Sequence, residues 1–481
     1  MEEKCELQTE SKKSGNKKIL YGYEVSQMII FVVLLSTIIV LPLLRIISDR
    51  VGFNTSMIMQ QIYMVGVFGV SILIIFIESL NNRVDWKTYK IPYGCLIVMW
   101  LFSFVLSFDA PIPKIALFGN TIRGEGLLQI GAYYGIFFLA SVMNKKAFRN
   151  IIIYAFCLVA SVFSVLGIFQ FLEINMFKTY FYGMASFGFG NPNYVAAYMV
   201  MFSGISMAGY WLYEEGDKLL HPFSWWNKWI WLLLLLISYI GCITTRCSSV
   251  YVGLIMNYLL LIFLSFFSRR KKVWRVICII VLLIIAMYIF NVLSNGGVWG
   301  EFTDTFKDIE AEGTIFGDSV GSSRMRIWKQ VIQLLPSYWL YGCGIEHYGY
   351  VSLIVYGLTE GLQITDVAHN EYLHTWITRG IIPLILYLVF LFYLFIPGVM
   401  QYKRCKSKTY GLSYMMLFPF FGYIAQAFFS MSMINVAPYF WMFCGFLLLE
   451  NGRKVYDEET YDRKNELINS NEIPEKNIEK I

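Results

Sequence analysis

The chain has 481 residues, of which 57% are hydrophobic and only 15% are charged. It contains many apolar runs of about 18 to 25 residues, the length that a helix needs to cross a bilayer. Its formal net charge of +6 comes from basic residues interleaved with these runs, which disfavours a nucleic-acid partner. The composition therefore predicts an all-α integral membrane protein and excludes a soluble globular fold.

The apolar runs predict about twelve transmembrane helices and no separate soluble domain. The first run follows a Lys-rich tail and lacks a small-residue cleavage site, so we expect a retained span rather than a secretory signal. The nine cysteines lie mostly within spans and form no CxxC, which predicts neither a disulfide framework nor a zinc site. The expected spans are 27–47, 56–79, 91–108, 125–143, 150–171, 193–213, 227–245, 247–267, 274–292, 380–400, 409–430 and 433–450.

Basic clusters follow every second span. By the positive-inside rule, these connections and both termini lie in the cytoplasm. The long polar connection before the tenth span then lies outside the cytoplasmic membrane. The clusters are NNRVDWKTYK (81–90), NKKAFR (144–149), SRRKKVWR (268–275) and YKRCKSK (402–408).

This topology divides the chain into five parts. The two ends of the chain are cytoplasmic tails. Between them, two groups of spans flank an extracytoplasmic loop that carries the candidate catalytic motifs. In chain order the parts are residues 1–26, 27–292 with spans 1–9, 293–379, 380–450 with spans 10–12, and 451–481.

Arg246, in CITTRCSS, lies between two apolar runs with almost no loop around it, on the same expected side as Arg123 and Arg324. An uncompensated charge near membrane depth costs several kcal/mol. Arg246 either extends to the outer interface or binds an anion, and a guanidinium suits phosphate oxygens. Because acidic residues such as Glu173 fall at span ends, an anionic ligand is the more economical partner.

The shortage of mid-span acids also argues against an ion-coupled transporter, because such proteins usually carry Asp, Glu or His within spans as relays. A flippase for a polysaccharide or lipid carrier stays open, since a passive basic cavity also suits a phosphorylated lipid. A flippase needs no general base beside the arginines. The presence of such a base would therefore distinguish an enzyme from a flippase.

The stretch AHNEYLHTWITRG (368–380) holds two of the four histidines in the chain. We expect a helix that begins at Asp366 or in the preceding turn and carries Glu371 in its first turn. On such a helix His374 lies about 140° from His369, a spacing that disfavours a shared metal ion. His369 is then either an ordinary hydrogen-bonded residue or a general base for an attacking hydroxyl.

Five stretches occur in order: GNTIRGEGLLQIGAYY, FGFGNPNYVAAYM, TTRCSS, GSSRMRIWKQVIQLLPSYWLYGCGIEHYGY and AHNEYLHTWITRGIIPLILYL. Together they resemble the O-antigen ligase and O-antigen polymerase superfamily of bacterial membrane glycosyltransferases, over roughly residues 115 to 400. The chain departs from the family pattern where Thr245 and Cys247 flank Arg246, and where Arg326 stands beside Arg324. Within the second stretch, GFGNPN predicts a turn with an asparagine helix cap.

The resemblance implies transfer of a glycan from an undecaprenyl diphosphate carrier to an acceptor hydroxyl on the outer face of the cytoplasmic membrane. It implies inversion at the anomeric carbon, no metal and no other cofactor, in the biosynthesis of a cell-surface polysaccharide. By position, His369 is the expected general base and Arg246 and Arg324 are the expected catalytic ligands of the diphosphate. Arg123 and Arg326 are further candidates for donor binding.

The acceptor stays open. A ligase takes a lipid core, peptidoglycan or protein as acceptor, whereas a polymerase of the same superfamily takes a second carrier-linked repeat unit. The expected partners are thus the carrier-linked glycan, a glycan, lipid or protein acceptor, and membrane lipids. Outside the family, the alternative is a polysaccharide or lipid-carrier transporter.

Overall fold

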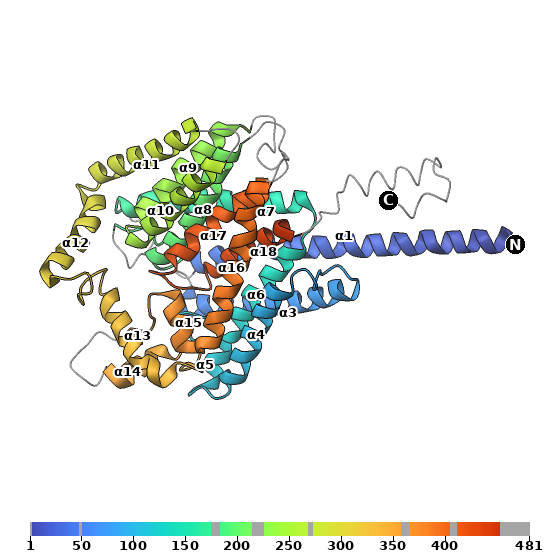
Figure 1. Cartoon of the computed structure of the whole chain (residues 1–481), viewed down its shortest axis with the longest axis horizontal. Coiled ribbons are helices and arrows are strands. Elements are labelled where there is room, and N and C mark those ends of the chain that lie inside the picture. Colours follow the sequence, from blue (N-terminus) through green and yellow to red (C-terminus); the bar gives the residue numbers. More distant parts are fainter. Residues whose placement is uncertain are drawn as a thin grey trace.

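The computed structural model describes residues 2–47, 51–174, 183–213, 226–267, 273–356, 365–404 and 411–452, and the regular structure in these ranges is helical (Figure 1). Most of the predicted C-terminal tail lies outside the described residues, as do parts of the basic clusters at 268–275 and 402–408.

In the described part of the chain, seven helices are long and apolar enough to cross a membrane. They are α1 (Glu2–Ile46, apolar from Gly22), α3 (Phe53–Leu80), α4 (Lys90–Ser107), α7 (Lys146–Phe171), α8 (Pro192–Leu212), α10 (Ser248–Phe267) and α11 (Val273–Leu293).

Helices with shorter apolar segments complete the bundle. They are α6 (Leu127–Val142), α9 (Lys228–Thr244), α16 (Ile381–Arg404, whose apolar segment is Ile381–Ile396), α17 (Gly411–Gln426) and α18 (Ala437–Gly452). Each of the twelve expected spans falls on one of these long or short helices, and the chain is a multi-pass membrane protein.

Helix α8 lies at the centre of one half of the bundle, where it packs against α9, α10 and α17. Its apolar window is 94% buried, whereas that of the peripheral helix α11 is 17% buried. Small residues allow close helix contacts: a Cβ on Gly204 would lie 2.8 Å from the backbone nitrogen of Pro419, and one on Gly445 would lie 2.4 Å from the carbonyl oxygen of Phe137.

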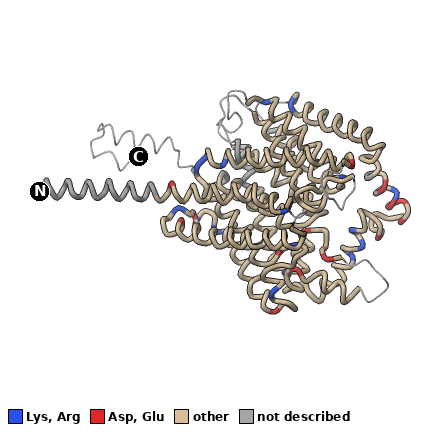
Figure 2. Tube along the Cα trace, turned by 180° about the vertical axis from the view of Figure 1, so that it is seen from behind, with Lys and Arg blue, Asp and Glu red and all other residues tan. Residues whose placement is uncertain are grey.

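The outer surface of the bundle is apolar. Large side chains such as Ile62 and Leu158 are exposed, as suits a surface that faces hydrocarbon. Figure 2 shows that Lys, Arg, Asp and Glu lie mainly towards helix ends and connections, while the packed helices are mostly uncharged. This distribution agrees with the assignment of the helices to a membrane.

The connections carry shorter helices. These are α5 (Pro113–Phe118), α12 (Gly297–Glu312), α13 (Arg324–Tyr338), α14 (Tyr348–Tyr356) and α15 (Glu371–Arg379), of which α12 to α15 lie away from the N-terminal end of α1 (Figure 1). Helices α13, α14 and α15 share a small hydrophobic core that includes Val331, Tyr348 and Ile377. The part of the long connection that contains α13, α14 and α15 therefore forms a packed helical cap, and this cap positions the candidate site.

Candidate active site

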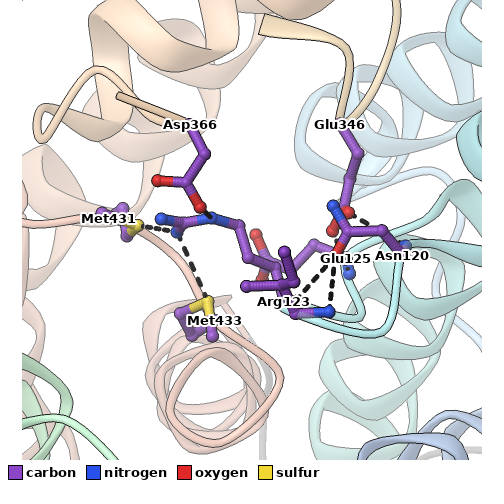
Figure 3. Close-up of polar contacts among 8 residues, drawn as sticks. Asn120, Arg123, Glu125, Glu346, Asp366, Met431 and Met433 are labelled. Carbon is purple, nitrogen blue, oxygen red and sulfur yellow. Dashed lines mark hydrogen bonds and ion pairs between the residues drawn. The ribbon is translucent and has the colours of Figure 1, made fainter. Parts of the chain in front are cut away.

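Arg123 joins three connections that are far apart in the sequence. Its Nε donates a hydrogen bond of 2.7 Å to Oδ2 of Asp366, and its Nη1 contacts the sulfur atoms of Met431 and Met433 (Figure 3). The loop before α6, the loop before α15 and the α17–α18 connection therefore meet around one guanidinium. All three belong to connections that the expected topology places on the same side.

The loop that presents Arg123 is shaped by local hydrogen bonds. Oδ1 of Asn120 accepts from the backbone N–H groups of Ile122 and Arg123, at 2.9 and 2.8 Å, which forms an Asx-type turn. A Cβ on Gly126 would lie 2.2 Å from the backbone nitrogen of Gly119, so the loop ends approach too closely for a larger residue. The GNTIRGEG sequence thus forms a tight turn with Arg123 at its tip.

A buried carboxylate from the long connection closes this loop. Glu346 accepts hydrogen bonds from the backbone N–H groups of Asn120, at 3.0 Å, and of Glu125 (Figure 3). Glu125 in turn accepts from the hydroxyls of Tyr133 and Ser432, at 3.0 and 3.1 Å. Glu125 lies in the loop before α6, although the expected span 125–143 would have included it.

His369 lies before helix α15, in a turn. Asn370 caps this helix, because its side chain accepts two backbone N–H groups of the first turn, each at 3.0 Å. The expected helix start at Asp366 is therefore wrong: α15 begins at Glu371, and His369 has a left-handed φ of 48°. Histidine and asparagine tolerate this conformation better than most residues with a side chain.

Helix α13 packs onto this turn. Nε1 of Trp328 donates to the carbonyl oxygen of Ala368 at 3.1 Å, directly before His369. Arg324, the first residue of α13, donates from Nε to the carbonyl oxygen of Phe429 at 3.2 Å and from Nη1 to that of Gly321 at 3.0 Å. The α13 helix therefore fixes both Arg324 and the backbone that carries His369.

Burial lowers the pKa of His369 to about 4, and the charges of Arg324 and Arg123 act in the same direction while Asp366 opposes them. A buried imidazolium beside two guanidinium groups is unfavourable. His369 is consequently neutral near pH 7. Three of the predicted site residues thus share one electrostatic environment.

Arg246 occupies the tight turn between α9 and α10, with a left-handed φ of 51°. Its Nη2 lies 3.5 Å from the carbonyl oxygen of Gly297. Burial lowers the pKa of Arg324, and an electrostatic interaction with Cys247 opposes this shift. Cys247 follows Arg246 in the α9–α10 turn, so this turn lies near Arg324 at the start of α13.

An acidic side chain lies closer to Arg246 than the sequence suggests. A Cβ on Gly183 would lie 3.3 Å from Nη1 of Arg246 and 3.4 Å from Oε1 of Glu173, so both side chains approach Gly183. The argument that an anionic ligand is the more economical partner of Arg246 is therefore weakened, because it assumed that no acidic side chain lies near. The end of α7 brings a carboxylate to the turn.

Arg326 follows Arg324 by two positions on α13, which corresponds to about 200° around the helix axis. The two side chains therefore leave opposite sides of the helix. On this geometry, Arg326 and Arg324 do not point to the same site.

A cavity of about 370 Å³ opens between the converging connections. Charged and titratable side chains in its wall include Arg123, Glu125, Glu346, Asp366, His374 and Arg379. The wall contains His374 rather than His369, so the second histidine of the motif faces the cavity. Its Nδ1 is buried without a hydrogen-bond partner among the described residues, and burial, together with Arg123, lowers its pKa to about 3.

Sequence reasoning missed several buried polar residues near the site. Arg45, at the end of α1, stacks on the Phe53 ring at 4.0 Å from the ring centroid. Gly190 has a φ of 78°, which favours glycine, and a Cβ there would also lie 2.0 Å from Nη2 of Arg45. Asn191 caps α8 by accepting from the backbone N–H of Asn193 at 2.9 Å, as GFGNPN predicts. The glycine indicated a turn, but no local pattern indicated its contact with Arg45.

The wall residues Glu346 and Arg379 belong to stretches that the sequence comparison with the superfamily already included. Neither stood out, because a single acid or base in a loop has many ordinary roles. Among the described residues, no group of three or more His, Cys, Asp and Glu side chains is arranged to hold a metal ion.

A family model described as O-antigen ligase matches residues 232–388. The matched segment runs from α9 into α16, so it includes Arg246, Arg324 and His369 and leaves out Arg123. No curated protein matches the chain. The chain therefore carries an O-antigen ligase domain and is a membrane glycosyltransferase of the ligase and polymerase type.

Proposed function

We propose that this protein transfers a glycan from an undecaprenyl diphosphate carrier to an acceptor hydroxyl, as an O-antigen ligase does, in the biosynthesis of a cell-surface polysaccharide. Transfer inverts the anomeric carbon and needs no metal. The observation that carries the proposal is the neutral imidazole of His369 within the electrostatic reach of Arg324 and Arg123. A transporter has no need of such a base beside its arginines.

In the proposed reaction, His369 accepts the proton of the acceptor hydroxyl while the hydroxyl oxygen attacks the anomeric carbon. The bond between that carbon and the diphosphate oxygen breaks, and the carrier diphosphate leaves with the electron pair. Arg324 and Arg246 stabilise the negative charge that develops on the leaving group, and Arg123 assists them. Fixed guanidinium groups thus take the place of a divalent cation.

Donor binding strengthens the proposed base. Burial lowers the pKa of His369 most, and the positive charges of Arg324 and Arg123 lower it further. A bound diphosphate compensates these charges, so the pKa of His369 rises in the donor complex. The imidazole becomes a better proton acceptor when a donor is present.

The proposal includes the full topology. Twelve spans place both termini, residues 1–26 and 451–481, in the cytoplasm and residues 293–379 outside. Spans 1–9 occupy residues 27–292 and spans 10–12 occupy residues 380–450. The convergence of the expected outer connections around Arg123 supports this arrangement, because connections on opposite sides of a membrane would not meet.

Purified protein in detergent, supplied with a lipid-linked glycan and candidate acceptors, tests the proposed transfer. We expect a new glycosidic bond of inverted configuration, detected by mass spectrometry and NMR, and undiminished activity in excess chelator. A strict requirement for magnesium or manganese would refute the arginine-based mechanism. A ladder of carrier-linked products would identify a polymerase. In protein reconstituted into liposomes, movement of the lipid across the bilayer without bond formation would identify a transporter.

A further inference from the structure

Arg379 is a buried cation in the wall of the cavity. It is the last residue of α15 and is only 9% exposed. Its Nε donates to the hydroxyl of Ser103 on α4 at 3.0 Å, and its Nη2 lies 3.4 Å from the hydroxyl of Tyr134 on α6. The guanidinium therefore reaches from the helical cap between two helices of the bundle.

The described contacts of Arg379 are with neutral hydroxyls. The cavity acids have other partners: Asp366 pairs with Arg123, Glu346 accepts two backbone N–H groups, and Glu371 accepts from two tyrosine hydroxyls. Among the described residues, no carboxylate lies within ion-pair distance of Arg379. A buried charge without an opposite charge is costly, so a ligand that supplies one gains free energy from this site.

The other acids of the wall do not neutralise it from a distance. Burial raises the pKa of Glu125 to about 8, and the charge of Glu346 adds to this shift. Burial also raises the pKa of Glu346 to about 7, against its backbone hydrogen bonds. Near neutral pH, Glu125 is mostly protonated and Glu346 is partly protonated. Burial also raises the pKa of Glu371, a further acid of the wall, against its hydrogen bonds from two tyrosine hydroxyls. The negative charge that these acids offer to Arg379 is therefore reduced.

A purely structural role explains part of this arrangement. A cation in the last turn of a helix interacts favourably with the carbonyl groups at its C-terminus. That interaction does not require the guanidinium to line a cavity, however, and Arg379 belongs to the cavity wall between α4 and α6. The helix role alone therefore leaves the place of the guanidinium in the cavity wall unexplained.

We propose that Arg379 forms an oxyanion subsite that binds a carboxylate or phosphate group carried by the glycan substrate. The proposal rests on glycan transfer as the proposed function and names an acidic glycan as its substrate class. The cavity volume of about 370 Å³ lies within the range of small-molecule sites, roughly 300–1,000 Å³. Tyr134 and Trp441, whose ring centroids lie 4.9 Å apart, supply apolar ring surface for the sugar in the same wall.

Isothermal titration of the full-length protein in detergent tests the subsite without any carrier lipid. The probes are glucuronate, its neutral isostere glucuronamide, glucose 6-phosphate, glucose and inorganic phosphate. We expect glucuronate to bind on the order of tenfold to a hundredfold more tightly than glucuronamide, as a charge-assisted hydrogen bond provides. Tighter binding of glucose 6-phosphate than of glucuronate would identify a phosphate as the preferred group, whereas equal binding of glucuronate and glucuronamide by the wild type would overturn the proposal.

Two variants assign the effect to the residue. Arg379→Gln should abolish the preference for glucuronate over glucuronamide, and Arg379→Lys should keep most of it. If Arg379→Gln retains the full preference, another cation binds the anion and the assignment is wrong. Should Arg379→Gln fail to fold, Arg379→Lys still tests the assignment: weaker binding of glucuronate with unchanged binding of glucuronamide supports it, whereas unchanged binding of both probes assigns the anion to another cation.

Different results would refute the proposed function and the proposed subsite. A His369→Gly protein should lose transfer but keep the preference for glucuronate, because His369 does not line the cavity. Arg379→Gln should raise KM for a glycan that bears an acidic group at least tenfold more than for a neutral one. An equal rise for both glycans would indicate that Arg379 only stabilises the end of α15.

Discussion

Arg123 and Asp366 are 243 positions apart in the chain, yet Nε of Arg123 lies 2.7 Å from Oδ2 of Asp366. This ion pair connects the loop before α6 to the turn that carries His369, three residues after Asp366. The same guanidinium lowers the pKa of His369. The pair therefore links a part of the chain outside the O-antigen ligase match to the candidate base inside it.

His369→Gly should reduce turnover by about 10²–10⁴, the usual cost of losing a general base. Glycine is the informative replacement because it accepts the left-handed backbone of this position without strain. Added imidazole should restore part of the turnover, since the deletion leaves space for it. Loss of transfer without rescue by any imidazole concentration would point to a structural role for His369.

In pH profiles, kcat/KM and kcat should begin to fall at different pH values on the acid side. The base must be neutral, so activity falls as the pH drops through its pKa, which is about 4 for His369 in the donor-free protein. The kcat/KM profile reports the free enzyme and should stay flat down to about pH 5, whereas kcat reports the donor complex and should begin to fall at a higher pH. Coincident limbs would contradict compensation of the arginine charges by the bound diphosphate.

Arg324→Ala should weaken donor binding as well as turnover, because in the proposed mechanism the guanidinium binds the diphosphate in both the ground state and the transition state. We expect KM for the lipid-linked donor to rise and kcat to fall, together by about 10²–10³ in kcat/KM. Lys329→Ala is the matched control, since Lys329 lies on the same helix and forms only an exposed ion pair with Asp318. Equal losses in both variants would indicate that α13 has merely been destabilised.

Between about pH 6.5 and 8, the thermal stability of the protein should fall as the pH rises, and Glu125→Gln should reduce this fall. Burial raises the pKa of Glu125 to about 8 in the fold, so the stability that its protonated form provides is present below the unfolded pKa of about 4.3 and is lost towards pH 8. The lowered pKa values of His369 and His374 have the opposite effect on stability only below about pH 6.5, so Tm measured by intrinsic fluorescence from pH 6.5 to 8 gives the slope. Glu310→Gln, an exposed position on α12, is the control and should keep the wild-type slope; a Glu125→Gln slope as steep as the wild type would disprove the assignment.

Thiol labelling checks the proposed orientation. Ile315→Cys, at a side chain that is 59% exposed, should react with an impermeant maleimide in intact cells whose protein lacks the native cysteines. Lys87→Cys, an exposed position between α3 and α4, should react only after permeabilisation. The opposite pattern would place residues 293–379 in the cytoplasm and remove the basis for an outward-facing site.

The helices could be located from the sequence, because each apolar run is a local property of about twenty consecutive residues. The same holds for the asparagine cap of α8 and for the tight turn at Arg246, both of which depend on neighbours within a few positions. The ordered motifs also indicated the O-antigen ligase domain that the family match bears out. The start of α15 was missed by a few residues, since Asn370 offers a better cap than Asp366.

The composition of the cavity was decided only by the tertiary structure. Arg123 comes from the loop before α6, and Glu346 and Arg379 come from different parts of the long connection before α16. Their partners Asp366, Asn120 and Ser103 lie 243, 226 and 276 positions away. No periodicity or spacing records such contacts, because they arise when the loops of many spans are brought to one end of the bundle. The orientation of the two histidines depended on the same packing: the cap at Asn370 and the contact from Trp328 leave His369 in a turn near Arg324 and direct His374 into the cavity.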